Sequence, residues 1–281
     1  MSGPSGPGAP DLLALLRRAG AGDHRDDPAE LDAPLRAAVL VPIVLHPAPS
    51  IVLTLRAQHL ARHPGQVSFP GGRIEPQDDS VEAAALREAE EEIGLSAAAV
   101  EIIGRLPTHV TGTGYRVTPV LGLLVPPVAP KPDPREVAEV FELPLAALTA
   151  WGMVVDVARA HEGQRMLIHA AAGGVGHFAV QLAAYFGATV TATCSTRNVS
   201  FVRELGAARV IDYTASRFDD EVSDHDVVID LIGNVHDDTA TRSLRTLRPG
   251  GLIVNAPTGS WPTMVDEAAA AGMRATSYKL S

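Results

Sequence analysis

The sequence predicts an α/β protein in two unlike parts, an α+β half followed by a doubly wound parallel sheet. Three observations support this prediction. The first half reads as strands with one helix among them, residues 126–134 contain five prolines, and strands then alternate with helices to the end. A length of 281 residues suits two domains, and a hydrophobic content of 46% is enough for two cores.

In the first half, apolar runs predict strands at residues 37–46, 50–56, 99–106 and 117–125, and a helix at about 80–93. Ser80 can cap the start of this helix, and Gly94 can end it. The expected buried side of the helix consists of Ala83, Ala84, Ala85, Leu86, Ala89 and Ile93. The prolines of residues 126–134 predict an extended loop or linker.

After Trp151 the order of elements becomes β-α-β. The predicted strands are residues 165–170, 189–193, 208–212, 226–231 and 252–255, and the predicted helices are residues 177–186 and 199–205. This alternation indicates a parallel sheet with helices on both faces.

The helix of the first half carries four glutamates in residues 88–92. Glu88 and Glu92 are four residues apart and point the same way from neighbouring turns, while Glu91 lies one row over. Carboxylates at this spacing repel unless a cation binds them, and magnesium is the usual cation where the substrate brings phosphate oxygens. A solvated acidic face is the alternative, but the apolar side, the two caps and Arg87 favour a metal site.

Residues 71–95 resemble the box of the Nudix hydrolases, which runs glycine, five residues, glutamate, seven residues and then R-E-U-x-E-E-x-G-U, with U apolar. The second half of the box matches at Arg87, Glu88, Ala89, Glu91, Glu92, Gly94 and Leu95. In the first half, Asp79 stands where the family has glutamate, and Gly72 lies one residue too far away. One extra loop residue explains this difference without moving the helix.

Residues 53–72 resemble a second signature, that of the coenzyme A pyrophosphatase branch. The matching positions are Arg56, Leu60, His63, Gly65 and Gln66, while Ala57 replaces the usual serine. Residues 111–122, TGTGYRVTPVLG, are similar to a further segment of this branch. The resemblance covers residues 36–148.

The resemblance implies a hydrolase that depends on Mg²⁺ or Mn²⁺ and cleaves a nucleoside-linked pyrophosphate, with coenzyme A or a derivative as the expected substrate. Glu88 and Glu92 would hold the metal, and Glu91 would share it or help to deprotonate the attacking water. Arg87 would orient the carboxylates, and Asp79 would support the helix start or another ion.

The coenzyme A contacts that the resemblance implies are Arg56, His63 and Gln66. For His63 a structural role is an equal alternative, because the sequence HPG is also typical of a turn.

The turn at residues 171–176, AAGGVG, resembles a dinucleotide-binding fingerprint. Gly173 would let a pyrophosphate approach the backbone, Gly176 would let the helix lie close to its strand, and Gly174 and Val175 complete the turn. Tight turns need glycine in any case, so the surrounding strand and helix carry the prediction.

The end of the second strand predicts which cofactor the turn would bind. NAD enzymes place an acid there, whereas this chain has Ser195 and Arg197, which favours NADP(H).

Residues 143–280 resemble the cofactor domain of the medium-chain dehydrogenase/reductase family, in its zinc-independent quinone oxidoreductase branch. The runs MLIHAAAGGVGHFAVQLAAYFGATV, ELGAARVIDY and LRPGGLIV carry this resemblance. Such enzymes have a catalytic domain before this one and more chain after it, so the alternative function is an NADP-binding oxidoreductase fragment or a nucleotide-sensing module. For His169 and His177, strand packing and an exposed helix position are the simpler interpretations.

The string ELPLAAL at residues 142–148 fits both resemblances, which indicates a fusion. We expect a flexible segment at residues 1–35, a Nudix domain at 36–148 and a Rossmann-type domain at 149–281. Within the first segment we expect no order at residues 1–9, a short helix at 12–18 and a loop at 23–32.

The composition limits the partners. A formal net charge of -10 argues against nucleic acid, and the single cysteine, Cys194, excludes an internal disulfide. No apolar run is long enough to span a bilayer, and the first residues lack a secretion signal. We therefore expect a cytoplasmic protein with a small nucleotide substrate, while its oligomeric state stays open.

Overall fold

A computed structural model of the chain describes residues 35–112, 114–257 and 259–278. The expectations for residues 1–9, 12–18 and 23–32 lie outside these residues. The chain divides after Pro144 into two compact units. The boundary predicted after residue 148 falls within α4 (Leu145–Trp151).

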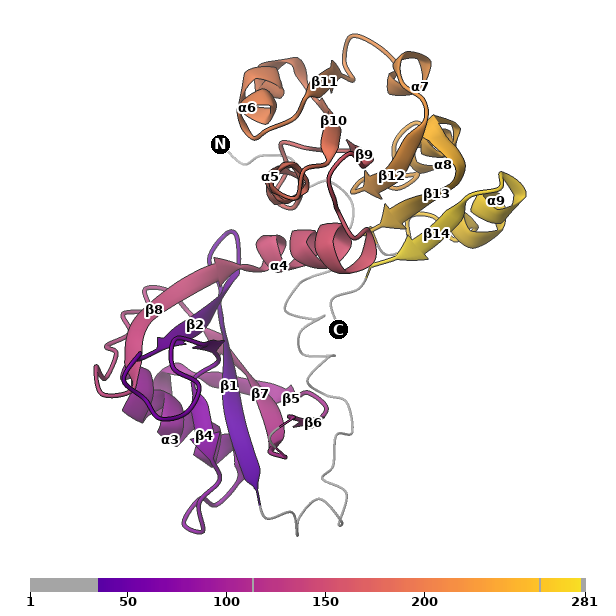
Figure 1. Cartoon of the computed structure of the whole chain (residues 1–281). Helices are drawn as coiled ribbons and strands as arrows, with labels where there is room; N and C mark the ends of the chain where they lie inside the picture. The colour runs from indigo at the N-terminus through magenta and orange to yellow at the C-terminus, as the bar shows by residue number, and fades with distance from the viewer. Residues whose placement is uncertain (1–34, 113, 258, 279–281) are drawn as a thin grey trace, which may run out of the picture. The chain divides into compact units, whose positions relative to one another are not determined.

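The N-terminal unit is built on a mixed sheet (Figure 1). Its elements are β1 (Arg36–Val44), β2 (Ser50–Arg56), β3 (Val67–Ser68), β4 (Gly71–Arg73), α3 (Val81–Ile93), η1 (Ala97–Ala99), β5 (Glu101–Arg105), β6 (His109–Val110), β7 (Arg116–Leu124) and β8 (Val137–Pro144). The sheet order is β3-β2-β1-β7-β5, with β4 paired to β1, β6 to β7 and β8 to β2. Strands β1 and β7 are parallel, and the other pairs are antiparallel.

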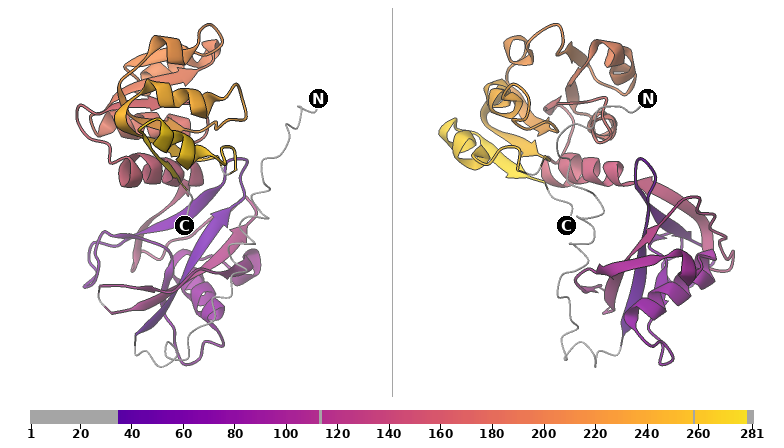
Figure 2. Two further views of the ribbon diagram at one scale, coloured as in Figure 1. Left: turned by 90° about the vertical axis from the view of Figure 1, so that its right-hand side faces the viewer. Right: turned by 180° about the vertical axis from the view of Figure 1, so that it is seen from behind.

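Helix α3 packs against the sheet of this unit, beside β4 and β1 (Figure 2). Its fully buried side chains Ala84, Ala85, Ala89 and Ile93 meet Leu40 and Val44 of β1 and Val120 and Leu124 of β7. The predicted helix and its strands are confirmed within two or three residues, although Ala83 and Leu86 are only half-buried. The short strands β3, β4 and β6 were not predicted, because two or three residues carry no detectable period.

The C-terminal unit is a parallel sheet in the order β11-β10-β9-β12-β13-β14. Its strands are β9 (Arg165–Ile168), β10 (Thr189–Cys194), β11 (Arg209–Asp212), β12 (His225–Asp230), β13 (Leu247–Asn255) and β14 (Arg274–Ser277). The helices are α4, η2 (Gly152–Val157), α5 (Gly176–Tyr185), η3 (Thr196–Asn198), α6 (Val199–Glu204), α7 (Phe218–Glu221), α8 (Thr239–Ser243), η4 (Leu244–Thr246) and α9 (Met264–Ala270).

Both faces of this sheet are covered, as predicted. On β9, Met166 and Ile168 belong to a core that includes α4 and α5, whereas Leu167 between them belongs to a core that includes α8 and α9. Alternate residues of a strand point to opposite faces, so each face has its own core. Strand β14, which was not predicted, has a polar sequence and is defined by its pairing with β13. No described helix has both the length and the apolar character that crossing a bilayer requires.

Candidate functional site

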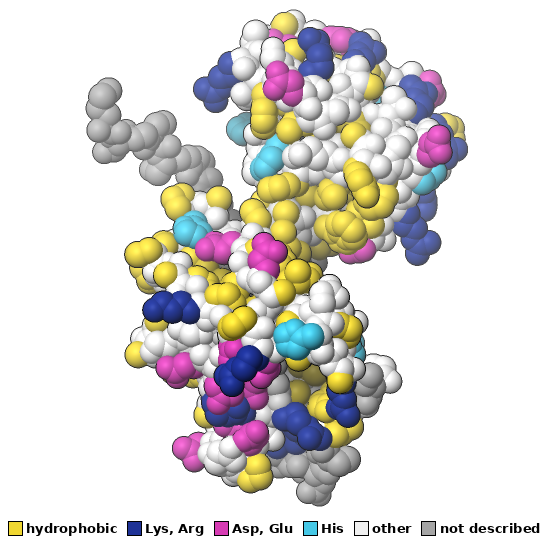
Figure 3. All heavy atoms as spheres, turned by 60° about the vertical axis from the view of Figure 1, so that its left-hand side comes forward, with side chains coloured by type: hydrophobic (Ala, Val, Ile, Leu, Met, Phe, Trp, Pro, Cys, Tyr) yellow, Lys and Arg dark blue, Asp and Glu magenta, His cyan; other side chains and the backbone are white. Residues whose placement is uncertain are grey.

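Helix α3 presents the acidic residues from a well-defined start and end. The Ser80 hydroxyl accepts a hydrogen bond from the Ala83 N–H at 3.0 Å, and Gly94 adopts the left-handed conformation with φ of 65°. Both predicted caps are confirmed, and they fix where each glutamate lies around the helix. Figure 3 shows acidic and basic side chains side by side on one face of the N-terminal unit.

Glu92 lies almost fully inside the protein, with 4% of its surface exposed. Its carboxylate accepts a hydrogen bond from the Gly71 N–H at 3.1 Å and lies 3.6 Å from Arg56 Nη1. Burial raises the pKa of Glu92 to about 7, and the Glu88 and Glu136 carboxylates act in the same direction. The Gly71 N–H and Arg56 oppose this rise only in part.

Glu88 lies one turn before Glu92 and packs against the backbone of β4. The space where a side chain on Gly72 would begin is occupied by its carboxyl group. Arg87 Nη1 donates to Glu88 Oε1 at 3.0 Å. Burial raises the pKa of Glu88 as well, with smaller contributions from Glu91 and Glu136.

Arg87 is held by a residue that sequence reasoning missed. Its Nε and Nη2 donate to the two carboxylate oxygens of Asp78 at 2.9 and 3.1 Å, and the Asp78 side chain is only 4% exposed. This pairing holds the pKa of Asp78 below its usual value. Asp79 is the residue that the spacing from Arg87 places where the family has glutamate. It is exposed, and the cap at the start of the helix is the Ser80 side chain.

Glu91 differs from its two neighbours because 62% of its side chain is exposed. Its carboxylate accepts a hydrogen bond from Arg87 Nη1 at 3.3 Å, the same nitrogen that binds Glu88. Arg87 therefore connects Glu88 and Glu91, as the orienting role predicted for it requires.

Glu136 is a further acidic residue that the sequence did not single out. It lies in the loop before β8, and its charge raises the pKa of both Glu88 and Glu92. The loop reaches the site because Asp133 N–H donates to the Glu92 carbonyl and the Ala57 N–H donates to the Glu136 carbonyl, each at 2.9 Å. No local pattern marks Glu136, since only tertiary contacts place it here.

Of the three predicted coenzyme A contacts, the structure brings Arg56 to the acidic residues. Its Nε is buried and has no hydrogen-bond partner among the described residues. His63 and Gln66 are exposed in the turn between β2 and β3, where His63 has a left-handed φ of 52° and its carbonyl accepts from the Gln66 N–H. His63 therefore takes part in the turn, and its contact with coenzyme A stays a prediction.

The donor set fits a divalent, oxygen-binding cation. Glu92 offers a buried carboxylate and Glu88 a half-buried one, and a cation would relieve their mutual repulsion. No group of three or more metal-binding side chains occurs among the described residues. Magnesium is commonly held by one or two carboxylates together with substrate phosphates, so two glutamates are compatible with it.

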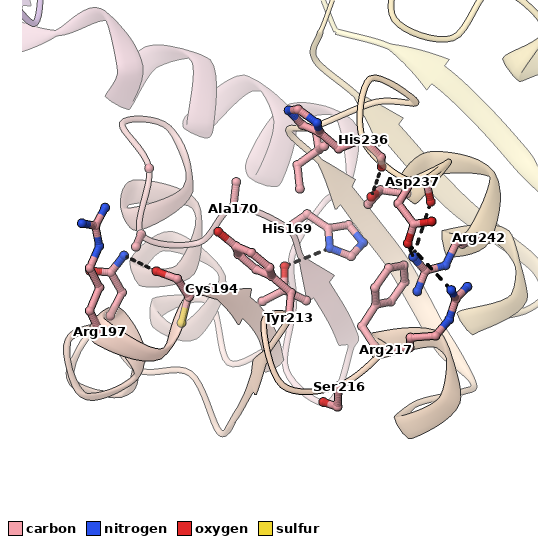
Figure 4. Close-up of a pocket in the computed structure, with 18 residues that line it drawn as sticks. His169, Ala170, Cys194, Arg197, Tyr213, Ser216, Arg217, His236, Asp237 and Arg242 are labelled. Atoms are coloured by element: carbon pink, nitrogen blue, oxygen red, sulfur yellow. Dashed lines mark hydrogen bonds and ion pairs between the residues drawn. The ribbon is translucent and has the colours of Figure 1, made fainter. Parts of the chain in front are cut away.

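The C-terminal unit has a pocket of about 550 Å³ where strands β9, β10 and β12 end (Figure 4). Gly173 lines this pocket at the predicted turn. A Cβ on Gly176 would overlap the Ala170 carbonyl oxygen, which confirms that this glycine permits close packing of α5 on its strand. Gly174 is exposed, and Val175 immediately precedes α5.

The predicted residues after β10 also reach this pocket. Ser195 and Arg197 line it, and Arg197 forms no ion pair with a described residue. Figure 4 shows Arg197 at one end, Tyr213 in the middle, and Arg217 with Arg242 at the other end. These last three residues were not predicted because they come from distant loops and helices. Arg242 is paired with Asp219 and Asp237.

The two histidines near the turn have structural environments. His169 is buried, with Nδ1 3.0 Å from the Thr193 hydroxyl and Nε2 2.9 Å from the Ser243 hydroxyl, and burial lowers its pKa to about 4. His177 is half-buried on α5, and its Nδ1 lies 2.9 Å from the Gly173 carbonyl oxygen. Strand packing is confirmed for His169, whereas His177 is less exposed than predicted.

Comparison with known proteins identifies the first unit. The NUDIX domain family matches residues 34–162. The uncharacterized Nudix hydrolase NudL of Shigella boydii serotype 4 (strain Sb227) is 47% identical over 133 residues, which are 47% of this chain and 69% of that protein. The chain belongs to the Nudix family. NudL of Escherichia coli O6:H1 (strain CFT073) matches with the same identity and coverage. The N-terminal unit is therefore a Nudix pyrophosphohydrolase domain.

The second unit of this Nudix protein matches the zinc-binding dehydrogenase family over residues 174–267. Among solved structures, CurK enoyl reductase is 30% identical with a TM-score of 0.44, covering 49% of this chain and 42% of that one. The quinone oxidoreductase from Coxiella burnetii is 24% identical with a TM-score of 0.47, covering 83% of this chain and 74% of that one. The chain thus spans about two fifths of the length of the first of these structures.

Proposed function

We propose that the Nudix unit is a hydrolase dependent on Mg²⁺ or Mn²⁺ that cleaves the pyrophosphate of coenzyme A or a coenzyme A derivative. The observation that carries this proposal is the pair of carboxylates on α3, the buried Glu92 and the half-buried Glu88, each with a raised pKa beside a neighbouring acid. Groups of this kind are typical of metal-binding and catalytic sites.

Each residue then has a defined task. Glu88 and Glu92 would hold the cation, which supplies charge to neutralise phosphate oxygens and to activate water. The Gly71 N–H keeps Glu92 in place, and Arg87 orients Glu88. Glu91 is exposed, and it would share the cation or accept the proton of the attacking water.

The substrate class rests on residues 53–72, which carry the coenzyme A signature. Arg56 brings this segment to Glu92, with its Nη1 3.6 Å from the carboxylate, and the exposed part of its guanidinium is the proposed contact for an anionic substrate group. His63 and Gln66, both exposed in the adjoining turn, are the other proposed coenzyme A contacts.

The test is an assay of the purified full chain with coenzyme A, NADH and ADP-ribose, with Mg²⁺ or with excess chelator. We expect coenzyme A to be split into two phosphomonoesters only when Mg²⁺ is present. Cleavage of none of the three would reject the hydrolase, activity in chelator would reject the metal, and faster cleavage of NADH or ADP-ribose would reject the substrate.

A second function, binding of NADP(H) by the C-terminal unit, is favoured by the pocket that Gly173 and Arg197 line, where Arg197 has no ion-pair partner in the described part of the chain. It would make this unit an oxidoreductase-type or nucleotide-sensing module. Fluorescence titration with NADPH should saturate in the wild type and fail in Gly173→Asp, whose carboxylate would face the pyrophosphate. Ala269→Asp, which adds the same charge on the exposed side of α9, serves as the control. An unchanged titration in Gly173→Asp would reject this site.

A further inference from the structure

Three side chains from separate segments meet beside β4 in the Nudix unit, and none of them is assigned above. Arg62 Nη1 donates to the Tyr115 hydroxyl at 3.5 Å, and the guanidinium of Arg73 lies over the Tyr115 ring, 5.8 Å from its centre. We refer to Arg62, Arg73 and Tyr115 as the arginine–tyrosine cluster. Two exposed positive charges share one half-buried aromatic ring.

The backbone fixes the position of this ring. Ala37 in β1 pairs with Arg73 of β4 on one side and with Val117 of β7 on the other, so β4 and the start of β7 lie level in the sheet. Tyr115 precedes β7 in a tight turn, where its N–H donates to the Thr111 hydroxyl at 3.0 Å and its carbonyl accepts from the Thr111 N–H at 2.9 Å. The aromatic ring is therefore a firm support for the two flexible arginines.

The two arginines of the cluster have no carboxylate partner among the described residues. Other arginines of the same unit do have one: Arg87 pairs with Asp78, and Arg105 pairs with Glu82. In a chain of net charge -10, these two neighbouring exposed guanidinium groups form a local positive patch that is available to an anion. Planar guanidinium groups suit phosphate oxygens in particular.

The cluster adjoins the carboxylates of α3. Arg87 Nη2 donates to the Arg73 carbonyl at 3.1 Å, while Nη1 of the same guanidinium donates to Glu88. An anion on the cluster would thus lie next to the cleavage site, yet its ligands are distinct from Glu88 and Glu92.

We propose that Arg62 and Arg73 bind a phosphomonoester of the substrate, separate from the pyrophosphate that is cleaved. Tyr115 is a positioning residue that holds both guanidinium groups through its hydroxyl and its ring. This inference rests on the proposed coenzyme A hydrolase activity and names the residues that would bind a phosphate on the ribose of that substrate.

Calorimetric titration of the full chain in Mg²⁺ buffer tests this subsite with two probes, adenosine 3′,5′-bisphosphate and adenosine 5′-monophosphate. Both share the base and the 5′-phosphate, so their affinity ratio isolates the second phosphate. We expect the wild type to bind the bisphosphate at least about tenfold more tightly, and Arg62→Gln and Arg73→Gln to remove most of this preference. Arg203→Gln, which removes an equal charge from an exposed position on α6, should keep it.

Tyr115→Phe keeps the ring under Arg73 but removes the acceptor for Arg62. It should lower the bisphosphate affinity about threefold, as the loss of one long, solvent-exposed hydrogen bond would, and leave the monophosphate affinity unchanged, which a general loss of structure would not do. Equal affinity of the wild type for the two probes, binding of neither, or an unaltered preference in both arginine variants would overturn the proposal.

The two proposals fail in different ways. An arginine-dependent preference without cleavage of coenzyme A would reject the hydrolase and keep the phosphate subsite. Cleavage of coenzyme A without the preference would reject the subsite alone.

Discussion

The carboxyl group of Glu88 occupies the space in which a side chain on residue 72 would begin: a Cβ on Gly72 would lie 2.5 Å from the Glu88 carboxyl carbon. A side chain at this position would displace the Glu88 carboxyl group from its place. The backbone of β4 is thereby one wall of the acidic site.

We therefore expect Gly72→Ala to displace the Glu88 carboxylate and to lower kcat for pyrophosphate hydrolysis about a hundredfold, the usual effect of a catalytic group moved by about 1 Å. Gly112→Ala is the matched control, because a Cβ there would meet no atom within 4 Å. Steady-state kinetics of the two variants provides the measurement. Full activity of Gly72→Ala would contradict the assigned position of Glu88.

Glu92→Gln should abolish hydrolysis, with a fall in kcat of at least about a hundredfold, because a charge is lost at the proposed metal site while shape is kept. The helix should remain folded, which circular dichroism would verify. Glu90→Gln changes an exposed glutamate of the same helix and should retain activity. Wild-type turnover of Glu92→Gln in Mg²⁺ would show that Glu92 does not bind the metal.

The raised pKa of Glu92 predicts how pH affects the metal-free protein. The pKa of Glu92 is about 7 in the folded protein, compared with an ordinary value of 4.5. As the pH rises, the unfolded chain therefore loses this proton at a lower pH than the folded protein does. The resulting stabilisation is complete below pH 4.5, declines between pH 4.5 and 7, and is absent above, a total of roughly 3 kcal/mol.

Hydrogen exchange of the α3 amides in excess chelator, corrected for intrinsic rates, measures this effect. The Glu92→Gln variant has no titrating proton at this position. The free energy of unfolding of the variant, relative to that of the wild type, should therefore increase by a similar amount as the pH rises from 4.5 to 7. A difference between the two proteins that does not change with pH would show that Glu92 titrates normally.

Gly176→Ala should destabilise the C-terminal unit by about 2 kcal/mol, because the new methyl group would overlap the Ala170 carbonyl and lie 2.8 Å from Ala171 Cα. The two tryptophans of the chain, Trp151 and Trp261, both belong to this unit. Thermal unfolding followed by tryptophan fluorescence therefore reports on it alone. Gly174→Ala, with no atom near its Cβ, should unfold as the wild type does, and equal midpoints for the two variants would refute the close packing of α5.

The arrangement of most long elements was predictable because their sequences carry a period. Helix α3 has apolar residues at helical spacing between Ser80 and Gly94, and the structure places its ends at the same positions. Strand β8 could not be assigned in this way. Its sequence VAEVFELP has no clear alternation, and its pairing with β2 defines it.

For the acidic site, the sequence by itself determined that Glu88, Glu91 and Glu92 lie close together on one helix. The spacing of residues along a helix decides which side chains are neighbours, and no other part of the chain is needed for it. Tertiary structure alone decided that Asp78 rather than Asp79 holds Arg87, that the charge of Glu136 acts on Glu88 and Glu92, and that Arg62 and Arg73 flank Tyr115. Contacts of this second kind join residues far apart in the chain or in an irregular loop. They depend on the path of the backbone through space, which local periodicity does not record.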